Sequence, residues 1–368
     1  MPEFIPGLKL SELYYHEAVR PIIDAHFPGQ AHSAALVGYG SDVIGFDTPL
    51  SSDHMWGPRL VLFLPETEFE RLRAAVDDAL RKNLPYTFRG YPTNFGAPDN
   101  DPRSAEAVSV RWLKEIDVGP VNHLVEITTP KKYITGYLGI DPYREVGVTD
   151  WLVILEHRLL AMTSGGVFHD DLGLTSFRQK ISYYPHDIWL YLLAAEWGKI
   201  DQEEPFMGRT GDVGDEIGSR IIAARLIQYL MHLCFLMERR YRPYSKWFGS
   251  AFLRLQCASR LTPVFNQVLS ASDWKERQRY LSQSYAFVAE MHNALHITLP
   301  LEVEISSFHE RPYLVLHSGL FADALLKAVQ DEAVRSLPPR VGSITQFVDS
   351  TDIADDIQLC QRFKQLYE

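Results

Sequence analysis

The 368-residue chain has few cysteines and no long, uninterrupted apolar run. Its three cysteines, Cys234, Cys257 and Cys360, lie far apart, so they form neither a metal-ligand spacing nor a disulfide framework. No apolar stretch approaches the length of a membrane-spanning helix. The N-terminus lacks the basic start and apolar segment of a secretory signal. We therefore expect a cytoplasmic protein with no membrane partner.

The chain also lacks the excess of basic residues that nucleic-acid binding favours. It has 36 Lys and Arg against 47 Asp and Glu, a formal net charge of −11. A dedicated DNA or RNA binder draws affinity from phosphate neutralisation and is normally basic. The composition therefore argues against nucleic acid as a partner. With 46% hydrophobic residues, the chain can build two domains with full cores.

The first 148 residues alternate patterns typical of strands and helices. Buried strands are predicted at 34–38, 59–64 and 123–128, where the residues are apolar or β-branched. An apolar stripe over 69–80 predicts a helix. Thr67 and Glu70 have the spacing of a capping box at its start. We expect a mixed sheet with helices over residues 1–148.

From residue 149 onward the sequence is mainly helical in pattern. Six segments with helical periodicity are separated by short loops that contain Gly or Pro. These segments are 151–162, 187–200, 217–240, 246–259, 273–295 and 321–333. We expect an α-helical bundle over residues 149–368. The fold class of the whole chain is then α+β.

One loop of the first domain has residues suited to phosphate and metal binding. Gly40 and Ser41 follow the first predicted strand, and Asp53 precedes the second. Glycine lets backbone N–H groups approach a triphosphate, and serine adds a hydroxyl donor. A carboxylate at Asp53 can hold Mg²⁺, and this metal neutralises phosphate charge during nucleotidyl transfer.

This loop resembles that of the nucleotidyltransferase superfamily, whose polymerase-β-like fold includes the aminoglycoside nucleotidyltransferases. The matching residues are Gly40, Ser41, Gly45, Ser52 and Asp53. Nearly the whole chain also looks like an uncharacterised bacterial family of this superfamily. Its features are Gly-Ser-Asp-Val-Ile-Gly-Phe-Asp from residue 40, Ser-Asp-His-Met-Trp-Gly-Pro-Arg from residue 52 and Tyr-Arg-Pro-Tyr-Ser-Lys-Trp from residue 241.

The resemblance implies transfer of a nucleoside monophosphate from an NTP, with ATP as the expected donor. The acceptor would be a hydroxyl group of a small molecule or a protein. Asp53 and Glu126, the latter on the third predicted strand, would be catalytic and would hold Mg²⁺ or Mn²⁺. Nucleotide binding would come from Gly40, Ser41, Arg59, Tyr244 and Lys246.

The sequence departs from the superfamily pattern at Met55, where a second aspartate is expected. A thioether is a poor ligand for a hard cation such as Mg²⁺. Asp42, Asp47 and His54 are the candidate substitutes. The departure leaves open a second function, a nucleotide-binding or regulatory protein that has lost catalysis.

A third possibility is a toxin–antitoxin-type protein with ribonuclease chemistry in the helical domain. Arg225 and His232 fit the loose Arg-x-His spacing of such domains, although a core histidine has the same appearance. Arg220 and Arg225 are expected to be buried with partners. Asp187 is predicted to be an N-cap, and Glu203-Glu204 a solvated loop pair.

Overall fold

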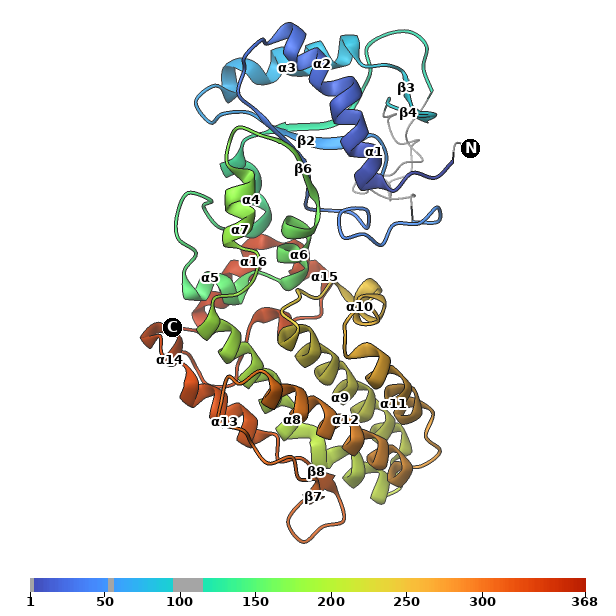
Figure 1. The fold of residues 1–368 in the computed structure, drawn as a ribbon, viewed down its shortest axis with the longest axis vertical. Helices are drawn as coiled ribbons and strands as arrows, with labels where there is room; N and C mark the ends of the chain where they lie inside the picture. Colours follow the sequence, from blue (N-terminus) through green and yellow to red (C-terminus); the bar gives the residue numbers. More distant parts are fainter. Residues whose placement is uncertain (1–2, 52–55, 95–114) are drawn as a thin grey trace. The chain divides into compact units, whose positions relative to one another are not determined.

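The computed structural model describes residues 3–51, 56–94 and 115–368. The chain divides into two compact units (Figure 1). The first comprises Met1–Val146 with Arg158–Ser182, and the second comprises Gly147–His157 with Tyr183–Glu368. The first segment of the first unit ends at Val146, two residues before the predicted boundary at 148. The prediction did not include Arg158–Ser182, which also belongs to the first unit.

The first unit contains a four-stranded mixed sheet in the order β5-β2-β1-β6. The strands are β1 (Ser33–Leu36), β2 (Arg59–Phe63), β5 (Leu124–Thr128) and β6 (Gly166–Asp170). Strand β1 pairs antiparallel with β2 and β6, whereas β5 runs parallel to β2. The two central strands are buried along their whole length, as their apolar sequences require. The three predicted strands are therefore confirmed.

Strand β6 has no counterpart among the predicted strands. Each of its residues is only partly buried, so its sequence shows neither a continuous apolar run nor a clear alternation. It pairs with β1 through Ala34↔His169 and Leu36↔Gly166, with an irregularity between Ala34 and Ala35. The strand thus comes from a part of the chain that was predicted to belong to the helical domain.

Helices from the N-terminal part of the first unit share an apolar core with the sheet. They are α1 (Gly7–Tyr14), the π-helical turn η1 (Tyr15–Val19), α2 (Arg20–His26) and α3 (Phe69–Asn83). The apolar stripe of α3 is buried as predicted. The predicted cap is wrong, because α3 begins at Phe69 after Glu68 and has no side-chain capping bond. Thr67 lies instead in a turn closed by the Glu68 N–H and the Pro65 carbonyl.

Smaller elements complete the first unit. They are the hairpin β3 (Thr87–Phe88) and β4 (Tyr91–Pro92), and the helices α4 (Pro130–Leu138), α6 (Glu156–Ser164) and α7 (Leu174–Lys180). Arg89 and Gly90, at φ 52° and 83°, form the two-residue turn of the hairpin. Helix α6 begins in the second unit and continues into the first.

The second unit is a bundle whose central helix is α8 (His186–Asp212), which packs against α9, α12 and α13 (Figure 1). The long helices around it are α9 (Glu216–Met237), α11 (Ala258–Ser270), α12 (Trp274–Ala294) and α13 (Gly319–Ala328). The short elements are α5 (Val148–Val153), α10 (Ser245–Phe252), β7 (Ser306–Ser307), β8 (Leu314–Val315), α14 (Glu332–Arg335), η4 (Ile344–Gln346), α15 (Thr351–Asp355), α16 (Ile357–Arg362) and η5 (Phe363–Leu366). The chain is therefore α+β, as predicted.

Helix α9 is the described helix that has the length and apolar composition to cross a membrane. Of its most apolar window, 56% is buried inside the protein. It packs against α8, α11 and α12. Burial between these helices accounts for its apolar sequence, as it does for the core helix of a bundle.

Two predictions about acidic residues on α8 are wrong. Asp187 follows the first residue of the helix, and its carboxylate accepts hydrogen bonds from the N–H groups of Gln330 and Asp331. Glu203 and Glu204 lie inside α8, because the helix continues to Asp212 through Pro205. The buried Glu204 carboxylate accepts from the Leu316 N–H and from the N–H and hydroxyl of Ser318, just before α13, and burial raises its pKa to about 7.

The close approach of β6 to β1 gives a test of the sheet. A methyl group on Gly165, just before β6, would lie 1.9 Å from the carbonyl oxygen of Leu36. We expect Gly165→Ala to lower the free energy of unfolding by about 1–3 kcal/mol, measured by urea denaturation. Gly136→Ala is the matched control. It has open space around its added methyl group on α4, and we expect a gain of up to about 1 kcal/mol. An unchanged midpoint for Gly165→Ala would contradict the β1–β6 pairing.

Candidate functional site

A buried ion pair joins the start of the loop that was predicted to bind a nucleotide to Arg59, the first residue of β2. Arg59 Nη2 lies 2.7 Å from Asp42 Oδ1 and 2.9 Å from Asp42 Oδ2, and it also donates to the Tyr39 carbonyl at 2.9 Å. Asp42 is 1% exposed and Arg59 9%. Burial raises the pKa of the Asp42 carboxyl group, although Arg59 acts in the opposite direction. Arg59 is thus engaged inside the protein, and its contact with a phosphate stays a prediction.

The same ion pair explains why glycine occupies position 40. Gly40 has φ +122°, in the region that favours glycine. A methyl group there would lie 2.2 Å from Asp42 Oδ1 and 2.4 Å from Arg59 Nη2. Ser41, half-buried, follows it, and its carbonyl accepts the N–H of Phe46 at 2.8 Å. Gly40 therefore has a structural role whether or not a phosphate binds.

The predicted catalytic carboxylates come from the loop and from the strand next to β2. Glu126 lies on β5, where it pairs in register with Val61 of β2. The residue is exposed, but partial burial of its carboxylate raises its pKa against the opposing charges of Lys132 and Arg59. Asp53, His54 and Met55 lie outside the described residues.

The two nucleotide-binding residues predicted in the helical domain lie in the second unit. Tyr244 is the N-cap residue of α10, and its hydroxyl accepts a hydrogen bond from Trp247 Nε1 at 2.9 Å. Lys246 is exposed, with its ammonium group 5.1 Å from the centroid of the Trp247 ring. Their binding of a nucleotide stays a prediction.

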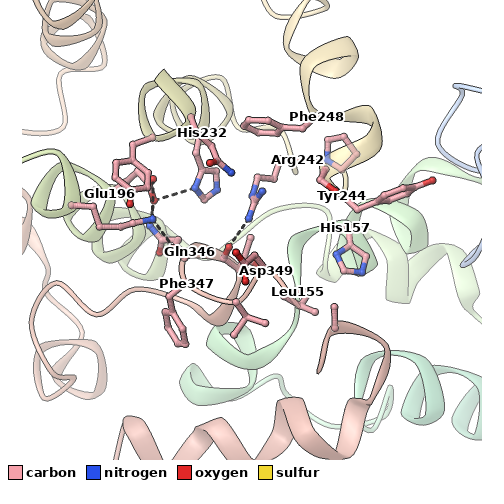
Figure 2. Close-up of a pocket in the computed structure, with 18 of the residues that line it drawn as sticks. Leu155, His157, Glu196, His232, Arg242, Tyr244, Phe248, Gln346, Phe347 and Asp349 are labelled. Carbon is pink, nitrogen blue, oxygen red and sulfur yellow. Dashed lines mark hydrogen bonds and ion pairs between the residues drawn. The ribbon is translucent and has the colours of Figure 1, made fainter. Parts of the chain in front are cut away.

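The second unit contains a pocket of about 420 Å³ (Figure 2). Its wall combines the cationic side chains of Lys199, Arg225 and Arg242 with the aromatic rings of Tyr229, Tyr244 and Phe347. Figure 2 shows Glu196, His232 and Arg242 around this cavity. Aromatic surface together with a few convergent polar groups is typical of small-molecule sites.

A buried cluster of charges lies at the base of the pocket. His232 Nε2 is 2.7 Å from Glu156 Oε2, and His232 Nδ1 is 3.1 Å from Glu196 Oε2. All three residues are at most 4% exposed. Burial acts to lower the pKa of His232, but the two carboxylates raise it above its ordinary value. Since a carboxylate only accepts, both ring nitrogens carry hydrogen and His232 is an imidazolium ion.

Two further cations complete the cluster. Lys199 Nζ lies 3.4 Å from Glu196 Oε1, and Arg242 Nε lies 3.3 Å from Glu156 Oε2. Burial acts to raise the pKa of Glu196, but Lys199, His232 and Gln346 together lower it to about 2. Three cations thus face two carboxylates, and the cluster carries a net charge of +1 (3 − 2).

The cluster contains one residue of the ribonuclease hypothesis. Arg225 and His232 line the same pocket, where both ring nitrogens of His232 are hydrogen-bonded to carboxylates, and ribonuclease chemistry there stays a prediction. The prediction that Arg220 and Arg225 are buried is wrong. Their side chains are 47% and 44% exposed, and they pair with Glu216 of α9 and Glu203 of α8, respectively.

The residues of this cluster other than His232 have no counterpart among the predicted site residues. Glu196 carried the clearest sequence signal, since it is the only acidic residue in the apolar run 188–198. A carboxylate that a helix buries must find a partner. Glu156 and Arg242 stand in segments with mixed patterns, and only the fold brings them to His232.

Comparison with known protein families gives a match to this part of the chain. Residues 151–248 match the family described as "Domain of unknown function (DUF4037)". The matched segment contains all the charged residues of the cluster: Glu156, Glu196, Lys199, His232 and Arg242. Gln346, which donates to Glu196, lies outside it. No curated protein and no solved structure matches the chain.

The charged His232 predicts that the free energy of unfolding depends on pH. We expect His232→Gln to lower the free energy of unfolding by about 3–5 kcal/mol at pH 6, because it leaves two buried carboxylates without their central cation. The folded-state pKa of His232 is raised, so its contribution is complete below about pH 6.5 and is lost as the pH rises through the raised pKa. The deficit of the variant should therefore narrow between pH 6 and 9 in urea denaturation.

The control for this measurement is His186→Gln, which replaces an exposed histidine on the first turn of α8. We expect it to unfold like the wild type at every pH. A His232→Gln deficit that stays constant from pH 6 to 9 would show that His232 is not charged in the folded protein.

Proposed function

We propose that this chain is a Mg²⁺-dependent nucleotidyltransferase that transfers a nucleoside monophosphate from an NTP to an acceptor hydroxyl. The arrangement of β1, β2 and β5 carries the proposal. The loop with Gly40, Ser41 and Asp53 joins the two central strands, and Glu126 lies on the strand directly beside β2. Asp53 precedes β2 in the sequence, and paired strands such as β2 and β5 lie about 5 Å apart.

The donor groups fit the metal that the proposal requires. Carboxylate oxygens are the ligands that Mg²⁺ prefers, and it usually binds one or two of them together with substrate phosphates. Glu126 is exposed and forms no ion pair with another described residue. When bound, Mg²⁺ would neutralise charge on the phosphates of the donor. Asp53 and Glu126 would hold the ion, and Gly40 and Ser41 would orient the triphosphate.

In the proposed reaction, the acceptor oxygen forms a bond to the α-phosphorus of the NTP. The bond from that phosphorus to the bridging oxygen breaks, and pyrophosphate leaves with the bonding electrons. The acceptor hydroxyl gives up its proton in the same step, and a carboxylate of the site can accept it. The expected donor is ATP, and a small molecule or a protein side chain is the acceptor class.

Met55 restricts the metal to fewer carboxylates than the superfamily uses. The structure gives the two nearby candidates other partners. Asp42 binds Arg59, and Asp47 Oδ2 accepts from the Gly7 N–H at 2.7 Å and from Trp56 Nε1 at 3.0 Å. The proposal therefore assigns the metal to Asp53 and Glu126 alone. The same facts favour the second candidate, a nucleotide-binding protein without catalysis.

The proposal places the protein in the cytoplasm, where NTPs and Mg²⁺ are abundant. The three cysteines are free and buried, which suits a reducing compartment. The pocket of the second unit, with its cations and aromatic rings, would bind a small polar molecule.

The test is pyrophosphate release from γ-labelled ATP with Mg²⁺, using a low-molecular-weight cell extract to supply acceptors. We expect release by the wild type and a loss of at least about 100-fold in Asp53→Asn and Glu126→Gln, because each removes a charge that the transition state needs. Glu70→Gln, an exposed acid of the same unit on α3, is the matched control and should keep full activity.

ATP binding measured by calorimetry separates the two candidates. Wild-type protein that binds ATP but releases no pyrophosphate, together with a Met55→Asp variant that does release it, would establish the non-catalytic function instead. Release by the wild type that survives both Asp53→Asn and Glu126→Gln would show that the site is elsewhere.

A further inference from the structure

Two histidines and an aspartate meet at the edge of the sheet, away from the proposed Mg²⁺ site. His32 immediately precedes β1, His169 lies in β6, and Asp171 directly follows β6. The register Ala34↔His169 and Ser33↔Asp170 continues to place His32 opposite Asp171, whose N–H donates to the His32 carbonyl at 3.1 Å. Residues opposite each other on paired strands, such as His32 and Asp171, have side chains on the same face of the sheet, as do residues two apart, such as His169 and Asp171. The three side chains therefore lie on one face.

The donor atoms of these side chains are already close. His169 Nε2 lies 2.8 Å from Asp171 Oδ2, and one donor atom from each of the three residues lies within 4.8 Å of the other two. Zinc bound at about 2.0–2.2 Å from each donor in a tetrahedron would hold them about 3.3–3.6 Å apart. Closing around an ion therefore requires shifts of roughly 1 Å, within reach of side-chain rotation.

The hydrogen bonds of His32 indicate which of its ring nitrogens could bind a metal. Its Nδ1 lies 3.1 Å from the Gln30 carbonyl oxygen, which only accepts, so Nδ1 carries the hydrogen. Histidines that bind metals usually donate their other ring N–H to a carbonyl or a carboxylate in this way. The lone pair then lies on Nε2, whose present partner is the Tyr15 hydroxyl at 2.9 Å.

Tyr15 reaches His32 from an unusual element. It is the first residue of the π-helical turn η1, and such turns occur often at functional sites. Its ring also stacks on His169, with centroids 6.3 Å apart and planes at 26°. One aromatic side chain thus covers both histidines, and its hydroxyl is the group that an incoming ion would displace from Nε2.

We propose that His32, His169 and Asp171 form a binding site for a divalent transition-metal ion, with Zn²⁺ as the ion that fits best. Two imidazoles and one carboxylate are a donor set for Zn²⁺ and its neighbours, whereas Mg²⁺ takes oxygen ligands. Three protein ligands leave one tetrahedral position for a water molecule or the Tyr15 oxygen.

This site is independent of the proposed transferase. It lies on β6 at one edge of the sheet, and Glu126 lies on β5 at the other. The ion would link β6 to the start of β1. In the sequence these two strands are separated by the first segment of the second unit, Gly147–His157. Zinc binding and pyrophosphate release can therefore succeed or fail separately.

The test is a calorimetric titration of chelator-treated full-length protein with Zn²⁺, and with Mg²⁺ for comparison. We expect one Zn²⁺ per chain, no competition from Mg²⁺, and a rise in Tm with added Zn²⁺. His169→Gln and Asp171→Asn should each weaken Zn²⁺ binding by at least about 10-fold to 100-fold. Both residues are partly exposed, so these variants should fold, which circular dichroism can check.

His26→Gln, an exposed histidine on α2 in the same unit, is the matched control and should bind Zn²⁺ like the wild type. Wild-type protein that binds no Zn²⁺, or binds it no more tightly than His169→Gln, would overturn the proposal. Binding that is unchanged in both His169→Gln and Asp171→Asn would likewise overturn it, because the ion would then lie elsewhere.

Discussion

The second unit is organised around the need to pair charges that its core buries. Glu196 stands in the most apolar stretch of α8 and is fully buried, so its carboxylate must be matched by cations and donors. Lys199 comes from the next turn of α8, His232 from α9, and Gln346 from η4 near the C-terminus. One carboxylate of α8 thus ties α9 and η4 to that helix.

The same requirement shapes the pocket. Because His232 is held between Glu156 and Glu196, the two carboxylates favour its charged form and fix the position of its ring. Lys199 is further held by the ring of Tyr229, 4.0 Å from its centroid, and by the Gln346 carbonyl at 2.6 Å. The polar groups of the pocket are therefore oriented before any ligand arrives, which reduces the entropy lost on binding.

The sequence predicted those elements whose burial repeats with a regular period. Strands β1, β2 and β5 and the stripe of α3 belong to this group. Strand β6 is half-buried throughout, so it shows no such period. Helix α11 buries Leu261, Phe265 and Val268 at helical spacing, but it contains Pro263, a residue that normally argues against a helix interior. Helix ends were predicted less well, since a cap depends on backbone angles that Thr67 and Asp187 do not reveal in sequence.

In the candidate sites, too, some features could be predicted from the sequence and others depend on the tertiary structure. The loop from Gly40 was found from its residue types, but its buried pair of Asp42 and Arg59 joins residues that nothing in the sequence connects. His32 and His169 meet only because β1 and β6 pair in one register. A pattern can therefore indicate which residues have useful chemistry, whereas their partners come from the tertiary structure.

The return of residues 158–182 to the first unit has a consequence for how the protein is made. During synthesis, β1 and β2 emerge early, but the partner on the other side of β1 is missing until β6 leaves the ribosome. Until then β1 presents an unpaired edge, the kind of surface that templates aggregation. A chain stopped at Val146 would keep that edge permanently. The first unit is thus a compact body in space without being a continuous stretch of the sequence.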